Sequence, residues 1–388
     1  MASYVGILCL SGQMGTALAQ VSPPLLEIRE GTPAGDLVRL SSGPQSNAVL
    51  TLEACSELNL SAWQAIGTFH DALWPYPDAV AYSQNRRFYR LQAAPRGAND
   101  DWKNQILYPV ESFSSTNSVQ DIRWVKFAIL LDDPTRVWFQ DSAKFLFHYD
   151  FATQRLARFR GFDRAAFDAV SLHRANQQVV LGAVLYPPGA GYYSPVTPFL
   201  EYGVQFVGLD PYTPAEIAQW YKLVTRTIYA TNQAQACYIP AFEQADVART
   251  NADAFAALGI RLGSAESWVT VNACYSPGWA LGRLKYFAAA EIGAAYGDGR
   301  LRPDDILLTD GVPADTPPLA GIISLTPSTP NSHTAILAQS FGIPFVYLPE
   351  ATERARVQDQ SCMTCPVGMP DLSAVALNVF SVSTALKS

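Results

Sequence analysis

The segment of residues 326–348, TPSTPNSHTAILAQSFGIPFVYL, allows the chain few local folds. Its prolines keep the first part extended and prevent an early helix start. Ser332 is then the best N-cap residue, so we expect a helix that begins at His333 and turns Ile336 and Leu337 inward. The glycine of FGIP ends this helix soon afterwards. The segment therefore predicts an extended loop, a short helix and a buried strand at PFVYL.

A histidine at the first helical position lies where unsatisfied backbone N–H groups and the positive end of the helix dipole meet. This field disfavours protonation of His333, which leaves a nitrogen lone pair available for attack. The same N–H groups would help to hold the negative charge of a phosphoryl group. His333 is therefore a candidate phosphoryl acceptor. On the local pattern alone, an exposed histidine that merely follows a cap is the simpler interpretation.

Three further blocks precede this loop in a fixed order. They are YSPGWALGRLKYF (Tyr275–Phe287), then DILLTDG, then AGIISL, and the last two are buried-strand patterns. Together with the loop, they resemble in order and spacing the mobile phosphohistidine domain of the phosphoenolpyruvate-utilising enzymes, which include pyruvate phosphate dikinase and phosphoenolpyruvate synthase. The matching residues are Ser276, Pro277, Gly278, Ala280, Gly282, Asp305, Ile306, Leu307, Gly321, Ile322, Ser332, His333, Ala335, Ile336, Leu337, Ala338, Gly342, Ile343 and Pro344.

The resemblance implies a role for each residue around the loop. His333 would carry the phosphoryl group, and Ser332 would cap and orient the helix. The backbone N–H groups of Thr334 and Ala335 would hold the phosphate, with Thr329 adding a loop hydroxyl nearby. No metal ligand is predicted in this chain.

The chain departs from the family pattern in ways that restrict the expected chemistry. Asn331 stands where the family has a threonine. The sequence from Asp359 onward matches no pattern we recognise, and a divergent and a truncated C-terminus both stay open. The chain also has no P-loop and lacks the nucleotide and phosphoenolpyruvate sites of a dikinase. We therefore expect no complete dikinase reaction: Mg²⁺ and ATP, or phosphoenolpyruvate, would be bound by a partner domain or chain. Three interpretations of the chain stay open: a carrier with a separate kinase, a fragment of a longer protein, and a protein that lost the reaction.

Residues 21–94 predict a small β module. Leu50, Leu52 and Ala54 alternate with polar residues, and RRFYRLQA closes the segment with the same period of two. The phrases NLSAWQAIGT and RRFYRL resemble a short β-sandwich module repeated in large secreted bacterial proteins, which implies a spacer or binding role. Residues 1–20 have the apolar core and the Ala-Leu-Ala pattern of a signal peptide but no Lys or Arg. Export to the periplasm or outside the cell and a cytoplasmic location therefore both stay open.

Residues 101–270 predict a mixed α/β region. The candidate strands are WVKFAILL, RVWFQD, KFLFHYDF, VVLGAVLY and YGVQFVGL. One helix begins at Pro214, with Thr213 as N-cap and Glu216 completing a capping box, and its apolar face continues to Ile228. A second helix covers Glu243 to Leu258. Parts of this region resemble the amino-terminal part of a group of bacterial phosphoenolpyruvate/pyruvate-binding proteins.

Composition excludes some classes of function. The chain is 49% apolar and 16% charged, which is typical of globular proteins, and its net charge of -7 without a basic cluster argues against a nucleic-acid partner. No apolar run approaches the roughly 20 residues of a membrane span. His70, His148 and His173 are interpreted as structural. Cys362 and Cys365 lack further ligands for a metal, so a local disulfide or two free thiols are the alternatives.

We therefore predict an α/β multidomain chain. It would have a β-sandwich module at 21–94, a mixed α/β domain at 101–270 and a swivelling β/β/α phosphohistidine domain at 271–388. The leading hypothesis is a dikinase-like phosphoryl carrier in which His333 serves an acceptor molecule that the sequence does not identify. The alternative is a secreted, non-catalytic binding or structural protein in which the last domain is an inert scaffold.

Overall fold

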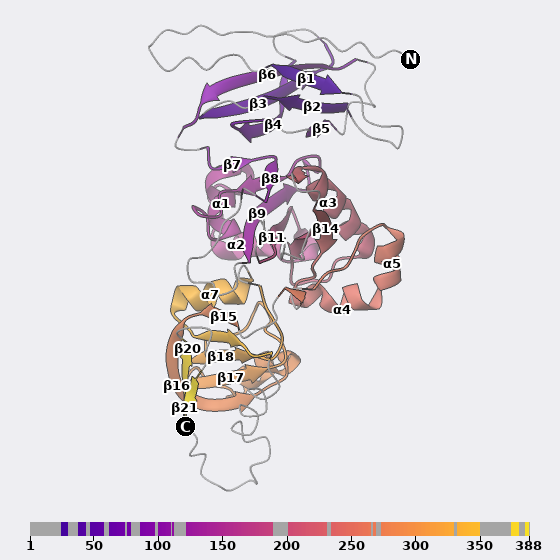
Figure 1. Ribbon diagram of the computed structural model, residues 1–388. Coiled ribbons are helices and arrows are strands. Elements are labelled where there is room, and N and C mark those ends of the chain that lie inside the picture. The colour runs from indigo at the N-terminus through magenta and orange to yellow at the C-terminus, as the bar shows by residue number, and fades with distance from the viewer. Residues whose placement is uncertain are drawn as a thin grey trace. The chain divides into compact units, whose positions relative to one another are not determined.

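The protein is a mixed α/β molecule with several sheets (Figure 1), which confirms the predicted fold class at that level. A computed structural model describes residues 25–29, 38–43, 47–57, 62–73, 76–78, 86–97, 100–109, 111, 122–188, 201–230, 234–264, 267–268, 273–329, 332–349, 374–379 and 385–387. The predicted signal peptide and the pair Cys362 and Cys365 lie outside these residues. The chain forms two compact units. The first is Met1–Ser112, Val125–Gly182 and Ala215–Ala234, and the second is Phe113–Trp124, Ala183–Pro214 and Gln235–Ser388.

The first unit begins with two three-stranded antiparallel sheets. Their orders are β1-β2-β5 and β4-β3-β6, with β1 at Leu26–Arg29, β2 at Val38–Ser42, β3 at Ala48–Cys55, β4 at Gln64–His70, β5 at Tyr76–Asp78 and β6 at Phe88–Pro95. The predicted alternation is confirmed in β3, where Leu50, Leu52 and Ala54 are buried. They share one hydrophobic core with Leu40 of β2 and Tyr76 of β5, so both sheets bury the same apolar side chains.

The rest of the described first unit contains strands and α-helices. These elements, some of which extend into the second unit, are β7 (Trp102–Lys103), β8 (Ile106–Tyr108), β9 (Arg123–Leu130), β10 (Trp138–Gln140), β11 (Val179–Tyr186), β13 (Ile228–Ala230), α1 (His148–Arg155), α2 (Arg164–Ser171) and α3 (Pro214–Arg226). Strand β10 pairs in antiparallel fashion with β7 and β9, and β13 pairs in parallel with β8.

Two predictions in these regions are wrong. KFLFHYDF is not a strand, because α1 begins at His148. Aromatic alternation over so few residues does not distinguish a strand from a short buried helix. In the structure, the ring of Phe145 packs against that of Phe151 in α1, with centroids 5.5 Å apart. Helix α3 does not reach Ile228. Thr227 bonds back to the carbonyl of Val224 through both its N–H and its hydroxyl, and Ile228 then starts β13.

The second unit contains one parallel strand pair and a seven-stranded sheet. Strand β12 (Glu201–Val207) pairs in parallel with β14 (Gln235–Tyr238), which is followed by α4 (Phe242–Thr250) and α5 (Ala252–Ala257). The single helix predicted over Glu243–Leu258 is therefore two helices. Asn251 separates them with a non-helical backbone, and its side-chain amide donates to the carbonyl of Val247 at 2.9 Å.

The seven-stranded sheet has the order β15-β19-β18-β17-β16-β20-β21. Its strands are β15 (Ala273–Ser276), β16 (Gly278–Tyr286), β17 (Asp305–Thr309), β18 (Gly321–Ser324), β19 (Phe345–Tyr347), β20 (Ala374–Val379) and β21 (Ala385–Lys387), with helices α6 (Ile292–Gly297) and α7 (His333–Phe341). Strands β16 to β19 are parallel, and the predicted strands at DILLT, GIIS and FVY are confirmed. The unrecognised C-terminal sequence supplies β20 and β21.

The structure explains why two positions of the sequence pattern, 282 and 342, are occupied by glycine. A Cβ atom on Gly282 would lie 2.4 Å from the carbonyl oxygen of Asp304, so only glycine allows β16 to approach β17 there. Gly342 has φ 67° and ends α7 in the left-handed conformation. The spacing of these glycines is therefore set by the backbone of the sheet and its helix.

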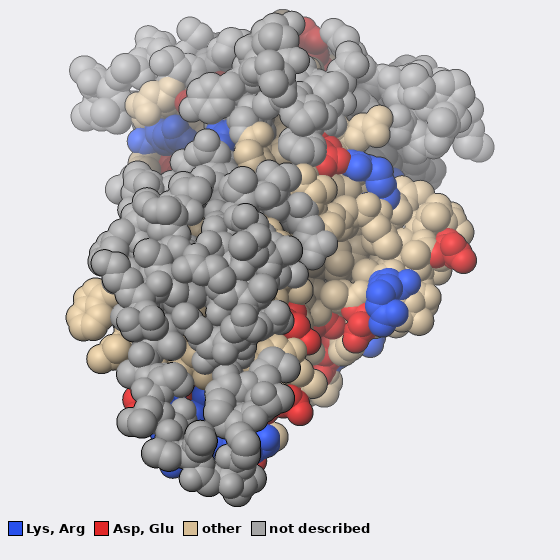
Figure 2. All heavy atoms as spheres, turned by 60° about the horizontal axis from the view of Figure 1, so that its bottom comes forward, with Lys and Arg blue, Asp and Glu red and all other residues tan. Residues whose placement is uncertain are grey.

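The described surface carries charges of both signs. On the face shown in Figure 2, described Lys and Arg side chains lie beside Asp and Glu side chains and form no basic patch. None of the described helices is long and apolar enough to cross a membrane.

His70 makes the stability of the first unit depend on pH. Burial, and then the nearby Lys103 and Arg96, lower the pKa of His70 from 6.5 to about 4. Between these values the unfolded chain binds a proton that the folded chain does not, so stability falls as the pH falls through this window. We expect the protection factors of the amides in β3 and β4, which correct each exchange rate for its intrinsic rate at that pH, to fall from pH 6.5 to about 4 in the wild type. The fall should be smaller in His70→Gln; an equal fall in both proteins would contradict the assignment.

Candidate functional site

A cavity of about 360 Å³ lies in the second unit. Its walls are formed where four strands of parallel pairs end, namely β12 and β14, and β17 and β18. Ligands of α/β proteins commonly bind at the carboxyl ends of parallel strands. The lining residues are Gln205, Val207, Ile239, Pro240, Ala241, Phe242, Glu243, Ala245, Gly263, Ser264, Asp310, Val312, Ala314, Ser324, Thr326, Pro327, Ser328, Thr329, Ser332, His333 and Thr334.

His333 lines this cavity as the first residue of α7. Ser332 has an extended backbone, and its hydroxyl accepts the N–H of Ala335 at 3.2 Å, so the predicted N-cap is confirmed. The carbonyl of Ser332 also accepts the first helical hydrogen bond, from Ile336 at 3.0 Å. These two bonds fix where the helix begins and hold the backbone of the half-buried His333 at the edge of the cavity.

The loop before α7 is tied to Tyr275 of β15. The Tyr275 hydroxyl donates to the carbonyl of Ser328 at 2.8 Å and accepts the N–H of the same residue at 2.8 Å. Ser328 in turn donates its hydroxyl to Ser332 Oγ at 2.8 Å, which connects the tyrosine to the cap. Burial raises the pKa of Tyr275 far above its ordinary value, so the hydroxyl keeps the proton that it donates.

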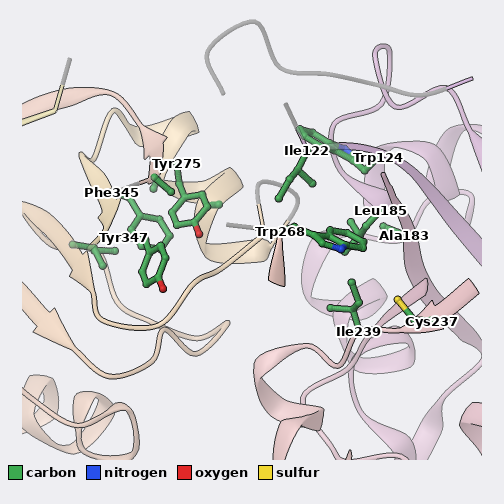
Figure 3. Close-up of a cluster of buried hydrophobic side chains, with 14 residues drawn as sticks. Ile122, Trp124, Ala183, Leu185, Cys237, Ile239, Trp268, Tyr275, Phe345 and Tyr347 are labelled. Carbon is green, nitrogen blue, oxygen red and sulfur yellow. The ribbon is translucent and has the colours of Figure 1, made fainter. Parts of the chain in front are cut away.

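Tyr275 is held by a hydrophobic cluster of the second unit (Figure 3). Its ring lies 4.8 Å from the ring of Phe345 in β19, centroid to centroid, and Tyr347 of the same strand belongs to the cluster. Ala335 and Ala338 of α7 are buried in it as well. The cluster therefore fixes both the anchor of the loop and the helix that begins with His333.

Two carboxylates lie on other walls of the cavity. Glu243, in the first turn of α4, accepts the N–H of Ala314 at 2.9 Å through Oε1. Burial raises the pKa of Glu243, and the bond from Ala314 opposes that change. Asp310, after β17, accepts the N–H of Ala289 at 2.8 Å. The described lining contains no Lys or Arg, so the formal charges of this wall are negative.

The structure brings together most of the residues predicted for the site. His333, Ser332, Thr334 and Thr329 line the cavity, where Thr329 donates its hydroxyl to Oε1 of Gln205 at 3.3 Å. The Thr334 hydroxyl donates to the carbonyl of Pro313 at 2.9 Å. Ala335 does not line the cavity, and its N–H already bonds to Ser332, so it would hold a phosphate only if the cap rearranged.

Sequence reasoning missed Gln205, Glu243, Asp310 and Tyr275. They belong to segments that are far apart in sequence and that the fold brings together. No local sequence pattern identifies them as site residues. Tyr275 does stand at the start of the SPG block, but nothing there indicates that its hydroxyl binds the loop.

The other described histidines fit structural roles or lie apart from this cavity. His148 Nε2 lies 2.9 Å from the carbonyl oxygen of Gly182, which supports its structural interpretation. Neither His70 nor His173 lines the cavity. In the described part of the chain, no group of three or more His, Cys, Asp or Glu side chains could hold a metal ion.

The sequence matches no protein-family model, and neither the curated proteins nor the solved structures compared with it include a similar chain.

The cap of α7 can be tested by a pair of serine variants in the same helix. Ser332→Ala removes the acceptor of the Ala335 N–H and should lower the free energy of unfolding by about 1 kcal/mol. Ser340 bonds back to the carbonyl of Ile336 from an exposed position, so Ser340→Ala should leave stability unchanged or raise it slightly. Urea unfolding followed by circular dichroism measures both. Equal losses in the two variants would show that Ser332 is no cap.

Proposed function

We propose that this protein is a phosphohistidine carrier in which His333 accepts a phosphoryl group from a partner and passes it to a small molecule. The observation that supports this most is the place of His333, at the first position of a capped helix that borders a cavity at the carboxyl ends of parallel strands. The resemblance of the four sequence blocks to a mobile phosphohistidine domain gives independent support. Under this proposal the sheet of β15 to β21 would be the swivelling part.

His333 would act as the nucleophile. A ring nitrogen would attack the phosphorus atom of the donor and form an N–P bond, while the donor's leaving group departs with the bonding electrons. The N-terminal end of α7 would stabilise the added negative charge. Ser332 would keep the helix start in place, and Thr334 would offer its backbone N–H. Ala335 would contribute through burial in the cluster, because its N–H already serves the cap.

The donor would be bound by another domain or chain. ATP and phosphoenolpyruvate are strongly anionic, and enzymes bind them with Lys, Arg and Mg²⁺. The described lining of the cavity has two carboxylates and no Lys or Arg, so its residues do not fit either donor. His333 would therefore have to meet the donor in a site that supplies those cations.

The two carboxylates of the cavity, in a described lining without Lys or Arg, also favour a second candidate. This candidate is a non-catalytic binding or structural protein with an inert phosphohistidine-like scaffold. In that case the cap and the loop would serve stability alone, and His333 would never be phosphorylated.

Labelled donors distinguish the two candidates. The purified protein would be incubated with ³²P-phosphoenolpyruvate or with γ-³²P-ATP, each with and without an extract of the cells that make it. We expect acid-labile, base-stable label on His333 with one donor in the presence of the extract, because the partner supplies the donor site. His333→Ala should remain unlabelled.

His173→Ala is the matched control, because His173 is exposed and does not line the cavity. It should be labelled like the wild type. A folded wild-type protein that takes no label from either donor, or label that persists in His333→Ala, would refute the carrier proposal.

A further inference from the structure

The cavity beside His333 combines hydroxyl groups, an amide and two carboxylates, and this combination selects a class of ligand. Glu243 and Asp310 contribute two negative charges, and the described lining contains no Lys or Arg. The N-termini of α4 and α7 each supply about half a positive charge, which offsets about one of the two carboxylates. The wall is therefore negative before any phosphoryl group is present.

A phosphoryl group on His333 would increase this negative charge. A positively charged group that enters the cavity would offset this charge. Among the described residues, no group of three or more acidic, His or Cys side chains could hold a metal ion by itself, so we take the positive group to be an organic cation. A volume of about 360 Å³ suits one small metabolite, since pockets for small molecules begin near 300 Å³.

We propose that this cavity binds the phosphoryl acceptor, and that the acceptor is a small molecule carrying both a hydroxyl group and a positive charge, such as an amino alcohol. This inference rests on the proposed carrier function. It places the second step, transfer of the phosphoryl group from His333 to the acceptor, within this chain. Asp310 binds the cation, and the hydroxyl lies toward Glu243 and the phosphoryl group on His333.

Glu243 is the catalytic base of this transfer. One lone pair of its carboxylate accepts the N–H of Ala314, and the remaining sites can accept a proton. Its partial burial favours the protonated form, which suits a group that takes up a proton during the reaction. The acceptor oxygen bonds to phosphorus, the N–P bond breaks with its electrons returning to the imidazole, and the hydroxyl proton passes to Glu243. No further reactant is needed.

Phosphoramidate provides a test that does not depend on the unidentified partner, because this small chemical donor phosphorylates histidine directly. In the presence of EDTA, phosphorus NMR would follow the phosphohistidine signal that the wild-type protein shows and His333→Ala lacks. Ethanolamine, ethylene glycol and glycolate share a two-carbon hydroxyl framework with positive, neutral and negative charge. We expect ethanolamine to accelerate loss of the signal about a hundredfold over water and to yield phosphoethanolamine. The other two should leave the rate near that in water.

Substitutions identify the base. Glu243→Gln should load normally and lose most of the ethanolamine acceleration, about a hundredfold. Asp246→Asn on the same helix is the matched control, because this exposed carboxylate pairs with Arg249 outside the cavity lining, and it should behave like the wild type. Asp310→Asn should raise the ethanolamine concentration needed for half-maximal discharge. If circular dichroism shows that Glu243→Gln is unfolded, the proposal is tested with Asp310→Asn instead.

The outcomes separate this inference from the function on which it rests. If folded wild-type protein shows no His333 signal, the carrier function itself fails. If His333 loads but ethanolamine discharges it no faster than glycolate does, the acceptor class is wrong and the carrier function stands. Acceleration that appears only when Mg²⁺ replaces EDTA would assign the positive charge to a metal ion and overturn the proposal.

Discussion

The paired hydrogen bonds between the Tyr275 hydroxyl and the backbone of Ser328 are the constraint on which the site depends. The tyrosine is buried in the hydrophobic cluster, so its hydroxyl has a fixed position. It holds both polar backbone groups of Ser328, and the Ser328 hydroxyl continues to Ser332. The place at which α7 begins is thereby linked to the packing of the sheet. Without these bonds, the loop before α7 would be free to adopt other conformations.

The electrostatics of the site divide the proposed reaction into two halves. A helix N-terminus favours a phosphoryl group on His333, whereas the carboxylates of Glu243 and Asp310 disfavour the anionic donors that would deliver it. Loading and discharge therefore need different surroundings. A phosphohistidine that moves between a cationic donor site and this acidic cavity satisfies both requirements. The positive charge of the proposed acceptor then offsets the negative charge of the cavity.

The sequence was informative where the physics is local. Ser332, His333 and Gly342 define a helix through capping and a left-handed terminus, and these effects act within a few residues, so α7 was predicted with correct ends. Strands β17, β18 and β19 were predicted because fully buried parallel strands are continuous apolar runs. The same reasoning failed at His148, where an aromatic run fits a strand or a helix equally well and packing decides.

The cavity could be predicted only in part, for a related reason. Its loop residues are consecutive in sequence, but Gln205 and Glu243 come from segments far from His333 along the chain. Their place depends on how β12 and β14 pair, and no local pattern encodes that pairing. The negative charge of the wall, which determines the proposed acceptor, was therefore invisible before the fold was known.

The most direct measurement for the central claim is a phosphorylation map of the full-length protein isolated from the cells that make it, under alkaline conditions that preserve phosphohistidine. The account predicts phosphate on His333, in a fraction that changes with the supply of the phosphoryl donor. A folded protein whose His333 is unmodified under every growth condition would contradict it.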